Sequence, residues 1–366
     1  MRQNSRSHYE HPMESYANCE RPRTNHLPFV TVVLGAMLST LAAWGQAKTD
    51  TKSGEDAKVT SHPYSVRSIV VAPSVKLEAL DWGGTGRPLV LLAGLGNDAH
   101  VFDTFASTLS KRYHVYAITR RGYGASDAPT PDGGNYSADR LADDVIAVLD
   151  QLNIVRPVIA GHSLAGEELS SIGSRFPARV AGLIYLDAGY QYALYDSSHP
   201  DTTIDANEMR RKLQAAVASP LPSEQAHAIA DVLKDWPALE KELEAKKKEL
   251  DATPANVESQ IRARLASPSA KIGPAIAAGL QRFTTIECPV LAIFADPHDF
   301  GPGLKGPELS AAQAHDKELT EPQAHLFETT LPNAKVVRIA HASHYVFQSN
   351  TAEVIREMDS FIDTLK

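Results

Sequence analysis

One serine in this chain of 366 residues stands where its hydroxyl could act as a nucleophile. The apolar segment 157–160 runs into the five residues 161–165 (GHSLA), and a helical pattern follows. In a sharp turn from a strand to a helix, a serine is held exposed at the edge of the sheet, and its neighbours must be small so that strand and helix can approach each other. Gly161 and Ala165 meet this requirement. The segment therefore predicts a nucleophile elbow at Ser163.

A serine hydroxyl is a weak nucleophile until a base takes its proton, so Ser163 needs a histidine and an acid that orients the histidine. His341 and His344 follow an apolar segment that ends at Ile339. Three aspartates also follow apolar segments and can supply the acid: Asp187, Asp296 and Asp299. The chain therefore offers nucleophile, acid and base in that order.

Alternating strand-like and helix-like segments would bring these residues together. Continuous apolar runs such as 89–92 are typical of strands buried on both faces of a parallel sheet. The carboxyl ends of such strands share one edge, where loops distant in sequence converge. We expect strands at 66–71, 75–82, 88–93, 115–119, 157–160, 180–186, 289–294 and 334–339, and helices at 138–152, 164–174 and 352–365.

Residues 190–285 interrupt this alternation and carry no convincing strand pattern. Four stretches have helical periodicity instead: 209–218, 224–233, 239–250 and 255–265. We therefore predict an α/β core formed by residues 63–189 and 286–366, with residues 190–285 inserted as a helical cap.

Several segments, in this order, resemble the α/β-hydrolase superfamily, in the subgroup with a helical cap between the sixth and seventh strands. They are LLAGLG at 91–96, RRGYGASD at 120–127, the elbow at Ser163, and the loops that follow Phe294 and Ile339. The resemblance covers about residues 64–366. It implies the α/β-hydrolase fold, a mostly parallel central sheet flanked by helices.

The resemblance also implies roles for individual residues. The late acid of the family stands a few residues beyond its strand, which favours Asp299 over Asp296 and Asp187. The histidine of the family precedes the closing helix by a short apolar run, which favours His344 over His341. The backbone amides of Leu95 and Leu164 would form the oxyanion hole.

Two positions depart from the pattern of the superfamily. Ala165 replaces the usual second glycine of the elbow, with Gly166 only after it, and Ala93-Gly94 replaces the usual His-Gly of the early loop. Backbone donors do not depend on side-chain identity, so the oxyanion hole is still expected.

The activity implied is cofactor-free hydrolysis of a small-molecule carboxylic ester through an acyl-enzyme. Hydrolysis of amides, lactones or carbon–carbon bonds remains an alternative, as does a non-catalytic ligand receptor on the same fold. Opening of haloalkanes or epoxides is less expected, because those members of the superfamily have an aspartate where this chain has Ser163.

A competing interpretation is an NADP-dependent oxidoreductase. Residues 94–99 match G-x-G-x-x-A after a strand, and Arg120 and Arg121 could bind a phosphate. Two strands precede this motif, however, and a dinucleotide-binding domain usually begins with it. The interpretation also leaves Ser163 unexplained.

Two further features of the sequence bear on binding. Glu167 lies one helical turn beyond Ser163 and is a possible contact for a cationic or hydroxyl group of a substrate. His341 and His344 lack a carboxylate cluster and a helical spacing that would complete a metal shell, so no metal is predicted.

Composition excludes other classes of function. The net charge is −8 and no long basic stripe occurs, so nucleic acid is not an expected partner. Only Cys19 and Cys288 are present, which excludes a disulfide framework and a cysteine zinc site.

The N-terminal region predicts export. Basic residues precede an apolar run at 29–44, and Gly45-Gln46-Ala47 follows. This order is typical of a signal peptide cleaved after Ala47, which would place the protein in the periplasm or outside the cell, and an uncleaved membrane anchor is the alternative. Residues 48–62 are expected to be a flexible linker.

Overall fold

A single eight-stranded sheet organises the chain in the computed structural model, which describes residues 63–366 except 133, 254–256, 260–261 and 263–270. The strand order is β1-β2-β4-β3-β5-β6-β7-β8. β2 is antiparallel to both β1 and β4, and all other neighbours are parallel. The strands are β1 Ser65–Ala72, β2 Val75–Gly83, β3 Pro88–Leu92, β4 His114–Ile118, β5 Val158–His162, β6 Gly182–Leu186, β7 Val290–Ala295 and β8 Ala334–Ile339. The predicted mostly parallel sheet is confirmed.

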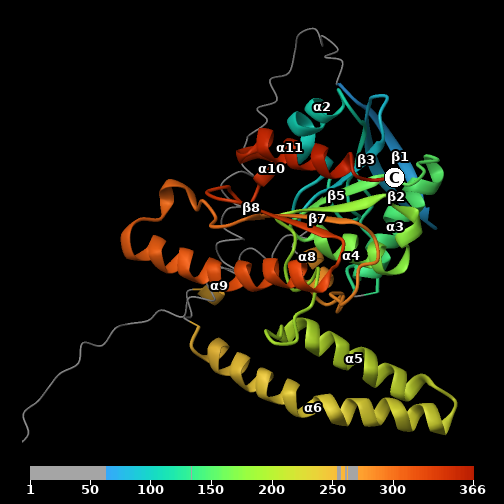
Figure 1. Ribbon diagram of the computed structural model, residues 1–366. Helices are drawn as coiled ribbons and strands as arrows, with labels where there is room; N and C mark the ends of the chain where they lie inside the picture. Colours follow the sequence, from blue (N-terminus) through green and yellow to red (C-terminus); the bar gives the residue numbers. More distant parts are fainter. Residues whose placement is uncertain (1–62, 133, 254–256, 260–261, 263–270) are drawn as a thin grey trace, which may run out of the picture. The chain divides into compact units, whose positions relative to one another are not determined.

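Helices cover both faces of the sheet (Figure 1). One apolar cluster joins the sheet to α3, α4 and α9, and a second joins the opposite face to α2 and α11. β5, β6 and β7 are buried along their whole length, which explains their unbroken apolar runs. The helices of the core are α2 Asp103–Leu109, α3 Ala138–Gln151, α4 Ala165–Arg175, α9 Gly306–Thr330, α10 Val346–Ser349 and α11 Thr351–Ile362, with short 3-10 helices at η1 Ala99–Phe102, η2 Pro177–Arg179 and η4 Gly301–Gly303.

Helix α9 was not predicted from the sequence. It has 25 residues and contains Pro322 in its interior. Few of its side chains are buried, so no continuous apolar stripe identifies it. This helix fills the connection between β7 and β8 and brings polar residues to the site described below.

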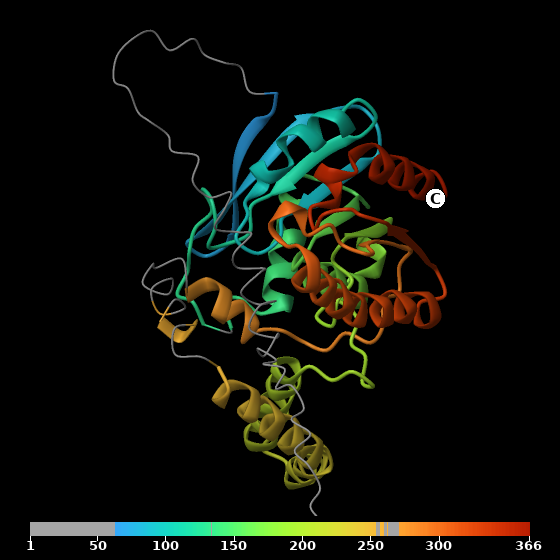
Figure 2. The ribbon, with the colours of Figure 1, turned by 90° about the vertical axis from the view of Figure 1, so that its left-hand side faces the viewer.

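In the described part of the segment between β6 and β7, there are helices and no strand. α5 Thr202–Ala218 and α6 Pro222–Asp251 pack side by side (Figures 1 and 2), and α8 Ile272–Ala277 follows. α6 is one helix where two were expected, and it continues through Pro237. A small cluster of Met209, Val232 and Leu239 holds the pair together.

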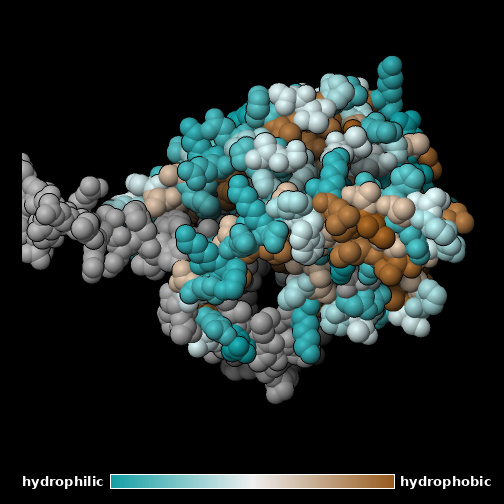
Figure 3. Space-filling model, turned by 90° about the horizontal axis from the view of Figure 1, so that it is seen from below, coloured by the Kyte–Doolittle hydropathy of each residue, from teal (hydrophilic) through white to brown (hydrophobic). Residues whose placement is uncertain are grey.

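The α5–α6 pair leaves several apolar side chains exposed. Figure 3 views the molecule from the side of this pair and shows hydrophobic residues among hydrophilic ones. The exposed side chains on the two helices include Leu213, Val217, Ile229, Leu233 and Trp236. Among the described residues, no helix combines the length and apolar character that crossing a bilayer requires. The predicted signal segment and linker, residues 1–62, lie outside the described residues.

Candidate active site

Ser163 occupies the predicted turn between β5 and α4. Its φ is +52°, a left-handed conformation that is uncommon for a residue other than glycine. A Cβ on Gly161 would lie 3.0 Å from the Cβ of Ala165, and a Cβ on Gly166 would lie 2.1 Å from the carbonyl oxygen of Ala188. The strand and helix therefore need small residues at these positions. Ala165 fits where the usual glycine is missing, and Gly166 is where the backbone of the next loop passes closest.

Ser163 lies within hydrogen-bond distance of the predicted histidine. Its Oγ is 2.8 Å from Nε2 of His344, which follows β8. On the other side of the ring, Nδ1 of His344 is 2.7 Å from Oδ2 of Asp187. Asp187 follows β6, the neighbour of β5 in the sheet, and is fully buried. Serine, imidazole and carboxylate thus form a continuous hydrogen-bonded chain.

The acid differs from the one expected. The Asp299 side chain is exposed and accepts the Gly301 N–H at 2.8 Å, whereas Nδ1 of His344 pairs with Asp187. Asp296 lies 3.6 Å from Nε of Arg338. Asp187, the less favoured candidate, takes the position because the chain turns sharply there, with a φ of +48°, and directs the carboxylate toward the loop after β8.

His341 does not belong to the hydrogen-bonded chain. It is exposed, and its amide donates to the Pro297 carbonyl oxygen at 3.0 Å. The choice of His344 over His341 therefore agrees with the geometry.

A second histidine, which sequence reasoning missed, contacts the same carboxylate. His298 Nε2 is 2.6 Å from Oδ2 of Asp187, and His298 Nδ1 is 2.7 Å from Oδ1 of Asp316 on α9. Burial alone would lower the pKa of His298, but the two carboxylates raise it to about 10. Burial alone would raise the pKa of Asp187, but His298 and His344 hold it below its usual value. Asp187 is therefore a charged carboxylate although it is buried.

Two backbone amides beside the serine have no hydrogen-bond acceptor in the described part of the chain. Among the described residues, none accepts a hydrogen bond from the N–H of Leu95 or of Leu164. Leu164 is the N-cap of α4, where amides have no partner within the helix. The loop that carries Leu95 lies against the serine, since a Cβ on Gly94 would be 3.0 Å from the Cβ of Ser163. The structure thus leaves free donors where an oxyanion hole was expected.

His162, which precedes the serine, supports the loop that carries His344. Its Nε2 is 2.9 Å from the carbonyl oxygen of His344. Burial lowers the pKa of His162 to about 3, so the ring is neutral and donates its N–H to this carbonyl. His162 thereby connects the elbow to the histidine loop.

A family model described as the alpha/beta hydrolase family matches residues 89–357. The chain belongs to the alpha/beta hydrolase family. This membership agrees with the order of the strands and with the turn at Ser163.

Curated relatives of this alpha/beta hydrolase match it over short stretches. A putative non-heme haloperoxidase of Mycobacterium phage D29 is 34% identical over 106 residues, 29% of this chain and 37% of that protein. A fluoroacetate dehalogenase of Burkholderia sp is 31% identical over 116 residues, 31% of this chain and 38% of that protein. The 3-oxoadipate enol-lactonase 2 of Acinetobacter baylyi is 29% identical over 117 residues, 32% and 43% of the two chains. The chain therefore spans well under half the length of these relatives.

Solved structures show the same fold. An esterase from Thermogutta terrifontis superimposes with a TM-score of 0.51 at 17% identity, over 82% of this chain and 98% of that one. A bromoperoxidase from Bacillus anthracis gives a TM-score of 0.52 at 19% identity, over 82% and 100% of the two chains. At these identities the likeness concerns the fold alone.

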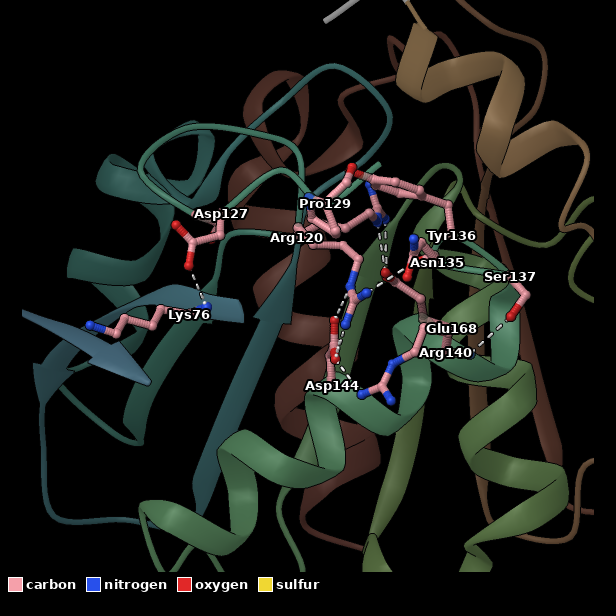
Figure 4. Close-up of polar contacts among 12 residues, drawn as sticks. Lys76, Arg120, Asp127, Pro129, Asn135, Tyr136, Ser137, Arg140, Asp144 and Glu168 are labelled. Atoms are coloured by element: carbon pink, nitrogen blue, oxygen red, sulfur yellow. Dashed lines mark hydrogen bonds and ion pairs between the residues drawn. The ribbon is translucent and has the colours of Figure 1, made fainter. Parts of the chain in front are cut away.

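The arginines that could have bound a phosphate in this alpha/beta hydrolase are buried in ion pairs. Arg120 donates to both carboxylate oxygens of Glu168, at 2.7 and 3.0 Å (Figure 4), and to the carbonyl oxygen of Ala93 at 2.9 Å. Arg121 donates to both oxygens of Asp144, at 2.6 and 2.7 Å. Neither guanidinium is available to a dinucleotide, and Arg120 instead fixes the loop that precedes Leu95.

Glu167 is fully buried, and among the described residues neither of its carboxylate oxygens has a hydrogen-bond partner. Burial raises its pKa well above the usual value, the neighbouring Glu168 raises it further, and Arg120 opposes the shift only in part. Burial therefore favours the neutral, protonated form of Glu167. A neutral carboxylic acid suits a hydroxyl or carbonyl group better than the cation considered from the sequence.

Asp187, His298 and His344 lie close enough together to be considered as metal ligands. Both ring nitrogens of His298 face carboxylates, so both carry protons and neither offers a lone pair. The described residues therefore fit a proton-bearing network better than a metal site.

Proposed function

We propose that this protein is a serine hydrolase acting on carboxylic esters. Ser163 is the nucleophile, His344 the general base, and Asp187 the acid that orients the base. The observation that carries the proposal is the contact of 2.8 Å between Ser163 Oγ and His344 Nε2, backed by Asp187 on the other ring nitrogen.

The reaction follows from this geometry. As Ser163 Oγ attacks the ester carbonyl carbon, its proton moves to His344 Nε2 and the carbonyl oxygen becomes an anion. Asp187 holds the Nδ1–H tautomer of His344 and stabilises the imidazolium. When the carbonyl re-forms, the alkoxide leaves with the proton from Nε2. Water, activated by the same imidazole, then hydrolyses the acyl-enzyme and restores Ser163.

The free amides of Leu95 and Leu164 are the proposed oxyanion donors. Each such donor lowers the barrier by roughly 3 kcal/mol when it is aimed at the developing anion. Arg120 supports this arrangement because it binds the carbonyl of Ala93 just before the loop.

The serine at the elbow favours acyl transfer over dehalogenation and epoxide opening. Relatives of this chain include a fluoroacetate dehalogenase and an enol-lactonase. We favour esters because a serine attacks an acyl carbon, whereas dehalogenation and epoxide opening need a carboxylate at the elbow. Amide, lactone and carbon–carbon hydrolysis use the same acyl chemistry, and a substrate screen separates them.

Labelling and turnover test the proposal together. A fluorophosphonate should form an adduct at Ser163, mapped by peptide mass spectrometry, and p-nitrophenyl esters of increasing acyl length should be hydrolysed. Ser163→Ala should abolish both, whereas Ser68→Ala, an exposed serine on β1, should abolish neither. Binding of esters without turnover and without an adduct would instead identify a ligand receptor.

We also propose export of the protein through residues 1–47. Mass spectrometry of the N-terminus of the protein recovered from its native host tests this. A terminus at Lys48 supports cleavage after Ala47, and a terminus that retains residues 29–44 supports an anchor.

A further inference from the structure

The carboxylate of Asp187 accepts hydrogen bonds from two imidazoles. His344 Nδ1 and His298 Nε2 reach the same oxygen, Oδ2, at 2.7 and 2.6 Å. The other oxygen, Oδ1, accepts the Ala295 amide at 3.0 Å and the Tyr190 hydroxyl at 3.4 Å. A triad requires only the contact with His344, so the contact with His298 needs its own explanation.

Carboxylates hold His298 from both sides. Asp316 Oδ1 lies 2.7 Å from His298 Nδ1, and Asp316 Oδ2 accepts the backbone amide of His298 at 3.1 Å. The Thr320 hydroxyl contacts Asp316 from the next turn of α9 at 3.4 Å. His298 is 8% exposed, so this pair of carboxylates acts on the ring with little solvent screening.

Two carboxylates and one imidazolium share this buried cluster. His298 lies between Asp187 and Asp316 and carries a positive charge, because both of its ring nitrogens must donate. Two further titratable groups of the described chain lie near His298. They are His344, whose ring centroid is 6.2 Å from that of His298, and Tyr190. Without His298, two carboxylates would share a site that excludes water, which strongly disfavours the ionised form of one of them.

We propose that His298 and Asp316 are positioning residues of the Ser163–His344–Asp187 site. His298, held by Asp316, keeps the Asp187 carboxylate ionised and fixed in the orientation that receives the N–H of His344. Neither residue hydrogen-bonds to Ser163. The proposal rests on the proposed function, since it concerns the same reaction.

Replacing the imidazolium tests the contact directly. In His298→Gln, a neutral amide takes the place of the cation, so Asp187 loses a charge-assisted hydrogen bond. We expect kcat to fall roughly 10- to 100-fold while KM stays within about twofold, because the change affects the transition state and not ester binding. His325→Gln, an exposed histidine on the same α9 as Asp316, is the control and should keep wild-type kcat.

A second substitution separates charge from hydrogen bonding. In Asp316→Asn, a neutral His298 can still donate Nε2–H to Asp187, because the new amide can donate to Nδ1. Removing the carboxylate should lower the pKa of His298 from about 10 by about 1–3 units. The pH at which kcat falls on the alkaline side should decrease by the same number of units. Below that pH, the activity of Asp316→Asn should stay near that of wild type. Glu318→Gln, on an exposed part of α9, should leave the profile unchanged.

The outcomes are distinct. If His298→Gln matches its control in kcat, or if Asp316→Asn loses activity equally at every pH or not at all, the positioning proposal is wrong. If His298→Gln does not fold, the pH profile of Asp316→Asn decides. The fluorophosphonate adduct separates the two proposals, because a wild-type protein that is not labelled at Ser163 contradicts the proposed function. Labelled variants with wild-type profiles contradict only the positioning role.

Discussion

Ser163 and Asp187 both have left-handed backbone conformations, with φ of +52° and +48°. Such conformations cost a residue other than glycine about 1–3 kcal/mol, and they persist only where surrounding structure enforces them. Here each lies at the carboxyl end of a buried strand, β5 and β6, and each directs its side chain toward His344. Six described residues other than glycine have a positive φ, and these two lie where the proposed mechanism requires a fixed side-chain direction.

Replacing each aspartate by asparagine should show whether Asp187 or Asp299 is the acid that orients His344. Asp187→Asn leaves the shape of the side chain unchanged but favours the wrong tautomer of His344, so we expect kcat to fall by roughly 10³- to 10⁴-fold. Asp299→Asn, on an exposed side chain, should change kcat less than about threefold. Steady-state ester hydrolysis measures both. A larger loss in Asp299→Asn than in Asp187→Asn would reverse the assignment made from the geometry.

Glu167 should make stability depend on pH. Its pKa in the folded protein lies well above the usual 4.5, so the native state holds a proton that the unfolded state releases. Its contribution to stability is complete below pH 4.5 and is lost as the pH rises through the folded-state pKa. Denaturant midpoints of wild type should therefore fall more steeply from acid to alkaline pH than those of Glu167→Gln. Parallel pH dependences would show that Glu167 is ionised in the native state.

At the scale of elements, the close approach of α4 to the loop after β6 brings the nucleophile and the acid together. Gly166 in α4 faces the Ala188 carbonyl, one residue beyond Asp187. A side chain here would push helix and loop apart. The distance between Ser163 and Asp187 therefore depends on a residue without a Cβ.

Gly166→Ala should destabilise the protein and also impair its activity. The added Cβ would lie 2.1 Å from the Ala188 oxygen, so the backbone must shift, at a cost of about 1–3 kcal/mol. Gly273→Ala in α8 is the matched control, because its Cβ meets nothing within 4 Å. That substitution should stabilise the helix by up to about 1 kcal/mol. Urea unfolding measures the stability of both variants. Equal midpoints for Gly166→Ala and Gly273→Ala would mean that α4 and the loop after β6 can separate freely.

At the scale of the whole molecule, a polar cluster attaches the α5–α6 pair to the core. Asp205 in α5 is buried and accepts hydrogen bonds from Arg282, at 2.9 and 2.5 Å, and from Tyr195 at 2.7 Å. The Asn207 amide also donates to the Ala277 carbonyl at 2.8 Å. The start of α5 is thus tied to segments that lead into β7 and out of β6.

Breaking this attachment should lower stability more than breaking an exposed ion pair. Arg282→Met leaves Asp205 without its cation, and we expect a loss of about 1–3 kcal/mol because Arg282 is itself partly exposed. Lys247→Met removes the ion pair between Lys247 and Asp251, whose two side chains are 75% and 63% exposed. It should change the free energy of unfolding by less than about 0.5 kcal/mol. Thermal unfolding followed by circular dichroism compares them. A loss in Lys247→Met as large as that in Arg282→Met would contradict this view of the attachment.

Local sequence patterns predicted a strand-to-helix turn at Ser163 and the strands of the sheet, and the family resemblance favoured His344 over His341. A buried parallel strand is a short apolar run, and a strand-to-helix turn needs small residues, so both are visible within a few positions. The helical patterns of α5 and α6, in the described part of residues 190–285, were visible for the same reason. Helix α9 was not, because it buries few side chains and carries no apolar stripe.

Only the tertiary structure decided which carboxylate meets His344. Three aspartates follow strands, and the direction in which each side chain points depends on backbone torsions and on loops more than 100 residues away in sequence. Asp187 and His344 are 157 positions apart, and Asp187 and His298 are 111 positions apart. Contacts over such separations leave no periodicity in the sequence, so the pairing of His298 with Asp316 became visible only when α9 was packed against the loop after β7.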